Sequence, residues 1–420
     1  MPQDATQRWN WKVGIVQWAE GLTGTVSKPV RKLVGESVLG ILTSGSVQLS
    51  AMARSLREPI GLHSTEKRLS RMLADHPEVA EAVNEETLRR TAPAVTEGMV
   101  LAIDPGDLNR DGARASEGRS RVRDGSTGDV VGGYPLLSIV ARDTKRGRTL
   151  PVWTQLYSTQ TPDHRSENAE LKAAITRVSA HLHSQPLWVM DRGGDRGELW
   201  DYWLERGDRV LVRACNQRHW QWRQGQKRTA QQIASYLPCK HQGQIGAGKQ
   251  VQFGITTVRL PEHPDRPLSL VVVQHGKQEP LVLVTTDRIR GRRQGQRLIR
   301  QYMDRWACEE GYRLTKQGFG LEQVQARKLA SLRNLVALAH MAWALLAVRD
   351  PEGQRLGPWC QPLKPGAAPK FLFYRLLQGW QRLFQTAETG LYGWFRQRQP
   401  EPLMADLFPQ SPAECRRLVP

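Results

Sequence analysis

The chain has 420 residues, of which 39% are hydrophobic and 24% are charged, which excludes a disordered or fibrous protein and predicts two or three folded domains. Its 60 Lys and Arg residues exceed its 41 Asp and Glu residues, and the net charge of +19 predicts a polyanionic partner such as nucleic acid. The sequence lacks an apolar run of about 18 residues, a secretory-signal pattern and a CxxC pair, so we expect an intracellular protein without a membrane span, a zinc module or a disulfide framework.

The first 97 residues are expected to be helical. Apolar residues recur every three or four positions over 30–42 and 47–56, which are separated by a Gly-containing break, and again over 64–73. Two short helices around such a break can form a helix-turn-helix that enters a DNA major groove, although an ordinary helical bundle has the same pattern. This segment carries 12 basic and 11 acidic residues, so the basic surplus lies elsewhere.

A mixed α/β sheet is predicted from residue 99 onwards. The apolar run 99–104 ends in Asp104, and a second apolar run, 186–191, ends in Asp191, as is typical of buried central strands. The other predicted elements are strands at 134–141 and 149–157, a helix at 166–182, a helix at about 198–205 and a strand at 209–214. This order favours a sheet with helices on its faces.

Residues 215–287 interrupt the alternation of helices and strands with a β-rich segment. Its strand-like runs are 251–260, 268–274 and 280–286. Long helical runs follow at 291–316 and 323–348, then a Pro/Gly-rich connector at 351–369 and an amphipathic stretch at 371–386. We therefore divide the chain into a helical DNA-binding region (1–97), a first part of a catalytic core (98–214), a β-rich insertion (215–287), a second part of the core (288–350) and a C-terminal helical region available for dimerisation (351–420).

The basic surplus is concentrated in two segments. Residues 209–260 contain nine basic residues and no acidic one, and residues 288–305 contain seven basic residues and one acidic residue. Together they account for about 15 of the 19 surplus charges, so we expect a DNA-binding surface there. Trp220 and Trp222 lie in the first segment, where their rings could stack on unpaired bases.

The acidic residues at the strand ends indicate metal-dependent phosphodiester chemistry. Such chemistry needs two or three carboxylates that converge on one point, because Mg²⁺ prefers carboxylate oxygens and two such ions can act on both the attacking and the leaving oxygen. Asp104 and Asp191 would meet in this way if their strands are neighbours. Asp104 taken alone fits a solvated or capping carboxylate at a strand end better, and only the pair makes a metal site an equal alternative.

The third carboxylate is marked by the spacing Y-x2-R-x3-E-x6-K of Tyr302, Arg305, Glu309 and Lys316. On a helix these four side chains share one face, where Glu309 could bind a metal ion while Arg305 and Lys316 hold phosphates. A solvated face with an Arg305–Glu309 ion pair has the same spacing. Glu310 is the rival carboxylate, but one helical residue turns the side chain by about 100°, and the spacing selects Glu309.

These residues resemble the DDE transposases of the insertion-sequence-4 type, whose third catalytic region carries the Y-x2-R-x3-E-x6-K signature. Residues 318–322 (GFGLE) and the strand-end pattern Asp191-Arg-Gly-Gly are also similar to that family, and the resemblance covers about residues 99–345. It implies an RNase H-like mixed-sheet core that carries a β-rich insertion and is flanked by helical N- and C-terminal regions. It also implies a triad of Asp104, Asp191 and Glu309 that binds two Mg²⁺ ions, with Mn²⁺ able to substitute.

The same resemblance implies a bacterial, cytoplasmic and nucleoid-associated enzyme that excises an insertion sequence, forms hairpin ends and joins them to target DNA. The expected partners are double-stranded DNA at terminal inverted repeats and at the target, and a second copy in a paired-end complex. The expected DNA-binding residues are Tyr302, Arg305, Lys316, Trp306, Arg292, Arg293, Arg300, Trp220 and Trp222. The alternatives are a transposase-derived protein that binds DNA without cutting it and an RNase H-like nuclease that never joins strands.

Overall fold

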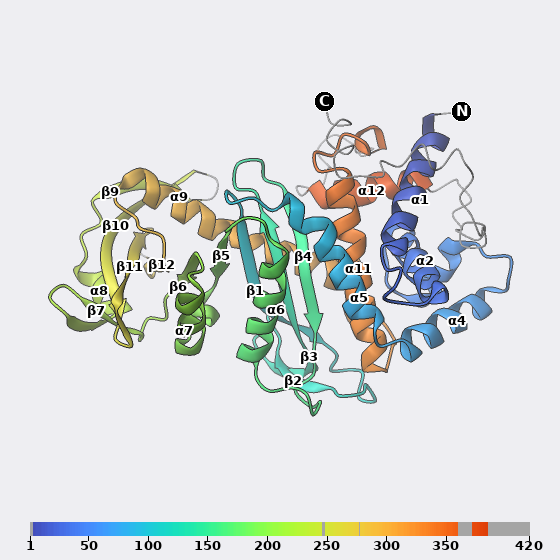
Figure 1. Ribbon diagram of the computed structural model, residues 1–420, viewed down its shortest axis with the longest axis horizontal. Helices are drawn as coiled ribbons and strands as arrows, with labels where there is room; N and C mark the ends of the chain where they lie inside the picture. Colours follow the sequence, from blue (N-terminus) through green and yellow to red (C-terminus); the bar gives the residue numbers. More distant parts are fainter. Residues whose placement is uncertain (1–2, 246–247, 277, 360–371, 385–420) are drawn as a thin grey trace.

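The computed structural model describes residues 3–245, 248–276, 278–359 and 372–384, and within them a single sheet of twelve strands runs through the molecule. The helices from the two ends of the chain gather at one end of the molecule, and the β-rich segment lies at the other end (Figure 1). The molecule is therefore elongated, with the predicted catalytic core in its middle.

The central part of the sheet has the strand order of an RNase H-like fold, β4-β3-β1-β5-β6. Strands β1, β3 and β4 pair antiparallel, whereas β5 and β6 are parallel to β1. Helix α6 (Glu167–His181) precedes β5 and helix α7 (Gly197–Arg206) precedes β6, as parallel neighbours require. The strands are β1 (Val100–Asn109), β3 (Val130–Arg142), β4 (Thr149–Leu156), β5 (Leu187–Met190) and β6 (Val210–Arg213). The predicted RNase H-like mixed sheet is confirmed by this topology.

The β-rich segment extends the central sheet instead of forming a separate one. Strand β12 (Leu281–Thr285) pairs antiparallel with β6, and the sheet continues from β12 through β11 and β10 to β7 and β8. The remaining elements of this end are β7 (His219–Trp222), β8 (Gln226–Thr229), α8 (Ala230–Tyr236), β9 (His241–Ile245), β10 (Lys249–Leu260) and β11 (His263–Gln274). At the opposite edge of the sheet, β2 (Ser120–Arg123) pairs with β3. The strands expected at 251–260, 268–274 and 280–286 are all present.

Seven helices from both ends of the described chain pack into one bundle. Helix α2 is buried over most of its length and contacts α11 and α12, which agrees with the helical-bundle interpretation of the first 97 residues. The bundle consists of α1 (Gln3–Glu20), α2 (Lys28–Ser44), α3 (Leu49–Leu56), α4 (Leu62–Asp75), α5 (Val79–Thr91), α11 (Leu329–Arg349) and α12 (Leu372–Phe384). Residues 1–97 and the C-terminal helices thus share a hydrophobic core.

Helix α11 is the central helix of this bundle. It is the one helix in the described chain that is long and apolar enough to cross a membrane, but 89% of its most apolar window is buried inside the protein. It packs against β4 of the sheet and against α2, α4, α5 and α12. The buried amide of Asn334 donates to the carbonyl oxygens of Leu73 and His76, at 2.8 and 2.9 Å, and so anchors α11 to the end of α4. These contacts account for its apolar character.

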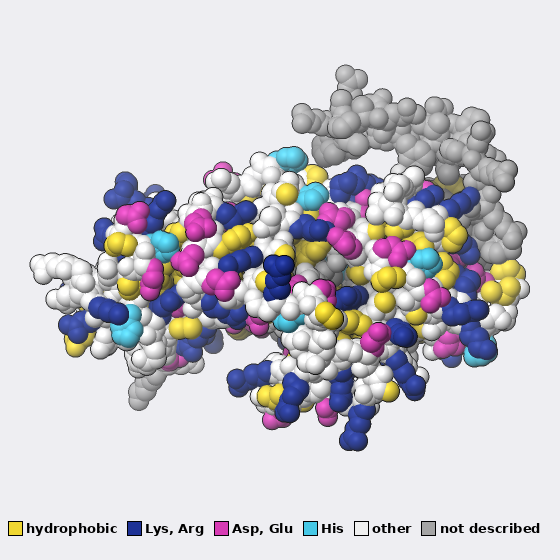
Figure 2. Space-filling view, turned by 60° about the horizontal axis from the view of Figure 1, so that its bottom comes forward, with side chains coloured by type: hydrophobic (Ala, Val, Ile, Leu, Met, Phe, Trp, Pro, Cys, Tyr) yellow, Lys and Arg dark blue, Asp and Glu magenta, His cyan; other side chains and the backbone are white. Residues whose placement is uncertain are grey.

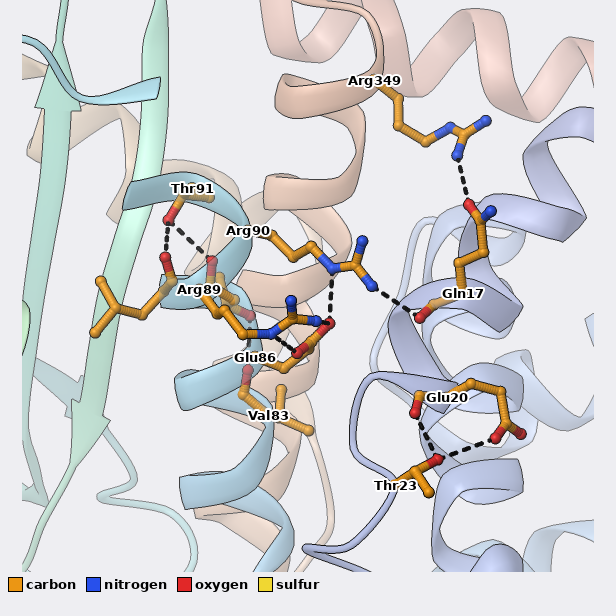
Figure 3. Close-up of polar contacts among 11 residues, drawn as sticks. Gln17, Glu20, Thr23, Val83, Glu86, Arg89, Arg90, Thr91 and Arg349 are labelled. Carbon is orange, nitrogen blue, oxygen red and sulfur yellow. Dashed lines mark hydrogen bonds and ion pairs between the residues drawn. The ribbon is translucent and has the colours of Figure 1, made fainter. Parts of the chain in front are cut away.

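A buried charged cluster joins α1, α5 and α11 (Figure 3). The carboxylate of Glu86, which is 3% exposed, accepts hydrogen bonds from Arg89 and Arg90. Arg90 also donates to the carbonyl oxygen of Gln17, and Arg349 donates to the Gln17 side chain. Two guanidinium partners satisfy the buried carboxylate, as a charge in such a position requires.

Helix α12 corresponds to the amphipathic stretch predicted at 371–386, of which residues 371, 385 and 386 lie outside the described residues. Its apolar stripe was the reason to expect dimerisation there. Trp380 is fully buried within its own chain, 5.3 Å from Trp11 and stacked on Phe384 at 4.5 Å between ring centroids. The stripe therefore covers the bundle, and the argument for dimerisation through it is wrong.

Candidate active site

Neighbouring strands place two carboxylates at the same edge of the parallel part of the sheet. Ala102 of β1 is the last residue paired with β5, opposite Val189, and Asp104 and Asp191 each follow two residues after this pair. The prediction that β1 ends at Asp104 is wrong, since pairing with β3 continues to Asn109; Asp104 instead lies just beyond the last residue paired with β5. Asp191 directly follows β5, and its Oδ1 accepts the N–H of Gly193 at 2.8 Å.

The helical run that carries the third carboxylate is irregular. In place of one helix over 291–316, the chain forms α9 (Arg292–Met303), a 3-10 turn (Asp304–Trp306), α10 (Ala307–Arg313) and a π-helical turn (Leu314–Gly318). Two residues beside Glu309 fasten α10 to the sheet. The Cys308 thiol donates to the carbonyl oxygen of Ala102, and the Tyr312 hydroxyl donates to those of Asp104 and Leu136. Glu309 is thereby held over the part of β1 that carries Asp104.

Arg305 links two of the three carboxylates. Its Nη2 lies 2.8 Å from Oε1 of Glu309, and its Nη1 lies 3.4 Å from Oδ1 of Asp104. The arginine is buried, at 8% exposure, and its Nε has no hydrogen-bond partner among the described residues. The Arg305–Glu309 ion pair foreseen as an alternative is therefore present; its Arg305 end is buried beside Asp104, whereas the Glu309 side chain is 47% exposed.

Burial and like charge shape the ionisation of this cluster. Burial, together with the charges of Asp191 and Glu309, raises the pKa of Asp104 to about 7 despite the attraction of Arg305 and Lys316. For Arg305, burial alone would lower the pKa, but Asp104, Tyr302 and Glu309 raise it, so the guanidinium stays charged. Burial is also the main reason that the pKa of Tyr302 is raised. Asp191 and Glu309 thus act electrostatically on Asp104, as members of one site would.

Lys316 approaches the site from the π-helical turn and contacts an acidic residue that sequence reasoning missed. Its Nζ lies 3.1 Å from Oδ1 of Asp107 and 3.7 Å from Oε1 of Glu322. Asp107 is buried, at 4% exposure, and also accepts the N–H of Gly125. Because β1 was predicted to end at Asp104, Asp107, which lies three residues further along the same strand, was not recognised as a residue of the site.

The donor set suits a hard cation in its chemistry, but not in its present arrangement. Three carboxylates are the ligands that Mg²⁺ and Mn²⁺ prefer. In the part of the chain that the structure describes, no three Asp, Glu, His or Cys side chains are placed so that they could hold one ion. The Arg305 guanidinium contacts both Asp104 and Glu309 and supplies the positive charge there that a metal ion would otherwise supply. Asp104, Asp191 and Glu309 thus offer the oxygen donors that a divalent metal ion needs, without being arranged around one point in this structure.

Helix α9 forms one wall of a groove lined by five basic side chains. Arg292, Arg293 and Arg300, which were expected to bind DNA, all line this groove. The lining is completed by Arg297, Gln296, Lys145, Thr144 and Gly98, and it contains no acidic residue. The groove is thus a strongly basic surface along α9.

The two tryptophans of the β-rich segment are core residues. Trp220 is fully buried and packs against the edge of Trp200, and Trp222 is 5% exposed and donates its Nε1–H to Thr256. The expectation that these rings stack on bases is wrong for this arrangement, because neither ring face is open to a ligand. Trp306, in contrast, is 61% exposed, and so does not pack in the core.

Acidic residues from outside the basic stretch 209–260 neutralise part of it. Arg209 lies 2.7 Å from Asp287, Arg213 lies 3.7 Å from Glu279, and Arg218 lies 2.9 Å from the buried Asp195. Asp195 also accepts hydrogen bonds from the Trp200 indole and the Cys215 amide, so it fastens this end of the molecule to the core. Lys and Arg side chains are spread over the whole face shown in Figure 2, the β-rich end included.

Glu310, the rival of Glu309, points away from the carboxylate cluster. It pairs with Arg313 at 3.1 Å and lines a pocket of about 210 Å³ together with Trp343, Tyr374 and Trp306. Burial and the charge of Glu309 raise the pKa of its carboxyl group, against the attraction of Arg313. Glu310 thus has its partners outside the cluster of Asp104, Arg305 and Glu309.

No family model and no curated protein matches this sequence. Among solved structures, the chain is similar to a piggyBac transposase, in a structure described as its synaptic complex with hairpin DNA. The alignment covers 96% of this chain and 84% of that chain, with 10% sequence identity and a TM-score of 0.47. The RNase H-like assignment itself follows from the strand order of the central sheet.

Proposed function

We propose that this protein is a DNA transposase that cleaves DNA at the ends of an insertion sequence and joins the freed strands to a target. The proposal is supported above all by Asp104 and Asp191, which each lie two residues beyond the last paired residues of neighbouring parallel strands, and by the fastening of the Glu309 helix to the first of these strands. Three carboxylates and a bridging arginine on an RNase H-like sheet suit phosphodiester chemistry better than they suit a structural ion-pair network.

In this proposal Asp104, Asp191 and Glu309 hold divalent metal ions, Mg²⁺ or Mn²⁺. When bound, such ions supply the Lewis acid that activates the attacking oxygen and stabilises the leaving oxygen. Arg305 and Lys316 bind the phosphates that flank the scissile bond, since both cations lie next to the carboxylates. The basic groove of α9 binds the DNA backbone and directs a strand towards Asp104 and Glu309.

We propose that Trp306 contacts DNA beside the reaction centre. Its ring would stack on a base that is displaced from the duplex at a hairpin end. It is exposed, adjoins Arg305 in the sequence and borders the pocket lined by Met303, Trp343 and Phe373. Replacing Trp306 by Ala should reduce hairpin formation more than first-strand nicking, whereas Phe should preserve both. Equal loss of both products in Trp306→Ala would argue against this role.

Two copies are proposed to act together, because one chain supplies one set of Asp104, Asp191 and Glu309 and an insertion sequence has two ends. The partners would be double-stranded DNA of the terminal repeats and of the target, at the nucleoid in a bacterial cytoplasm. Light scattering of the protein with and without DNA that carries both ends tests the stoichiometry. A complex with one protein per two ends would contradict the pairing.

The test is an incubation of the protein with DNA that carries the segments flanking its coding sequence, in Mg²⁺ and in EDTA. A transposase yields nicks, hairpins and strands joined to a second DNA, all dependent on Mg²⁺. Nicks without any joined product would instead identify an RNase H-like nuclease. Tight binding without any cleavage would identify a DNA-binding protein derived from a transposase.

A further inference from the structure

The position of Arg305 has a consequence for the order in which ligands bind. Its guanidinium contacts Glu309 and Asp104, the same carboxylates that are proposed to hold metal ions. A divalent ion and a guanidinium cannot both occupy the space between these two carboxylates. Arg305 is also one of the two cations proposed to hold DNA phosphates, so its two roles compete for one side chain.

The geometry points to Arg305 as an internal cation that a divalent metal ion displaces and that thereby couples metal binding to DNA binding. This inference rests on the proposed carboxylate–metal site. With no metal ion, the buried Arg305 offsets the repulsion between Asp104, which is largely covered, and Glu309, which is more exposed. When a metal ion binds, its charge offsets the repulsion between the carboxylates in place of Arg305, and the guanidinium is released.

Two features of Arg305 favour a side chain that moves. It belongs to the 3-10 turn Asp304–Trp306, between α9 and α10, instead of to a regular helix. Its Nε is buried and has no partner within the described structure, so the guanidinium is only partly satisfied in its present place. A phosphate could accept from Nε and one Nη together, as guanidinium groups commonly donate to such anions.

The expected consequence is positive cooperativity. Metal binding frees Arg305 for a phosphate, and a phosphate that takes Arg305 leaves the carboxylates free for the metal ion. By linkage, metal ions and DNA must then raise each other's affinity by the same factor. In this scheme the carboxylates bind metal ions weakly until DNA is present.

Mn²⁺ binding to the DNA-free protein, measured by electron paramagnetic resonance of the free ion, tests the competition. Arg305→Gln should bind Mn²⁺ roughly tenfold more tightly than wild type, because a positive charge a few ångströms away is removed. Arg305→Lys keeps the charge and should stay within about threefold of wild type. The matched control is Arg313→Gln, which removes a cation of α10 that pairs with Glu310 outside the cluster and should change the affinity by less than about twofold.

Binding of a short fluorescein-labelled duplex, with and without Ca²⁺, tests the coupling without any cleavage. Wild type and Arg313→Gln should bind the duplex several-fold more tightly in Ca²⁺, and this increase should vanish in Arg305→Gln. Circular dichroism melting establishes that each variant is folded. If Arg305→Gln is unfolded, Arg305→Met takes its place, with the same expectations.

The inference is overturned if the folded, charge-removing variant binds Mn²⁺ no more tightly than wild type, or if it keeps the Ca²⁺ effect on DNA affinity. These results are independent of whether the protein is a transposase. Tighter Mn²⁺ binding in a protein that cuts no DNA would retain Arg305 as the internal cation and reject the proposed function. If wild type cleaves and joins DNA but Arg305→Gln has an unchanged Mn²⁺ affinity, the proposed function is retained and the role of Arg305 as an internal cation is rejected.

Discussion

The Nζ of Lys316 lies 3.1 Å from the Oδ1 of Asp107, so both basic residues of the Y-x2-R-x3-E-x6-K pattern are held by acidic residues of β1. Asp104 contacts Arg305, and Asp107, three residues later, contacts Lys316. The two pairs fix the irregular helical run against the sheet in its middle and near its end. They also leave both cations beside the carboxylates on which the proposed chemistry depends.

Replacing Asp107 by Asn should destabilise the protein by roughly 3 kcal/mol, because the substitution leaves the half-buried Lys316 without its nearer partner. The free energy of unfolding from urea titrations measures the effect. Glu322→Gln is the matched control, since Glu322 is more exposed and lies 3.7 Å from Lys316; it should cost less than about 1 kcal/mol. Equal costs for the two variants would show that Asp107 does not position Lys316.

The basic groove predicts a specific salt dependence of DNA binding. Helix α9 is about 18 Å long and would follow about five phosphates of one strand. Removing three of its cations, as in Arg293→Gln with Arg297→Gln and Arg300→Gln, should lower the slope of log K against log salt by roughly two to three. The control is Arg266→Gln, an exposed arginine that pairs with its neighbour Asp265. If the slopes of the triple variant and the control both equal that of wild type, DNA does not lie along α9.

His340 predicts a loss of stability in acid. It is buried in α11, neither ring nitrogen has a partner in the described chain, and burial lowers its pKa to about 3 from an ordinary value of 6.5. Between these two values the unfolded chain binds the proton and the folded protein does not, so stability falls as the pH is lowered from 6.5. Between pH 7 and pH 5 the protonation of His340 in the unfolded chain should lower the free energy of unfolding of wild type by about 2 kcal/mol. The variant His340→Leu should not show this loss when its unfolding in urea is measured at the two pH values. Parallel pH profiles would contradict the prediction.

The burial of Trp380 within its own chain predicts that α12 belongs to the folded monomer. Trp380→Ala should lower the free energy of unfolding by about 3 to 5 kcal/mol, since a fully buried indole packed on Trp11 and Phe384 is removed. Denaturant unfolding at two protein concentrations is the measurement. A cost that changes with concentration would instead indicate that Trp380 acts at an interface between copies.

Much of the architecture could be predicted from local sequence. The apolar runs before Asp104 and Asp191 are buried neighbouring strands, as their composition indicated, and the three main strands of the β-rich segment lie where alternating apolar residues put them. The spacing from Tyr302 to Lys316 selected Glu309, which contacts Arg305, over Glu310, which contacts Arg313. Such patterns succeed because burial of a face depends on residues close in the chain.

The rest depended on contacts between residues far apart in the sequence. Pro105 and Gly106 would end most strands, yet β1 continues because β3 pairs with it as far as Asn109. The alternation around Trp220 fits a DNA-facing or a buried strand equally well, and the edge contact with Trp200 decides it. The burial of Trp380 against Trp11 joins the two ends of the chain, which no local pattern can reveal.

DNA cleavage by Glu309→Gln compared with Glu310→Gln tests the central claim most directly. The two residues are adjacent, but Glu309 contacts Arg305 at the carboxylate cluster, whereas Glu310 contacts Arg313 outside it. With Mg²⁺ and DNA carrying the ends, Glu309→Gln should bind the DNA and reduce cleavage by at least about 10³-fold, and Glu310→Gln should cut within about tenfold of wild type. Cleavage by Glu309→Gln at the wild-type rate, or its loss only in Glu310→Gln, would contradict the assignment of the active site.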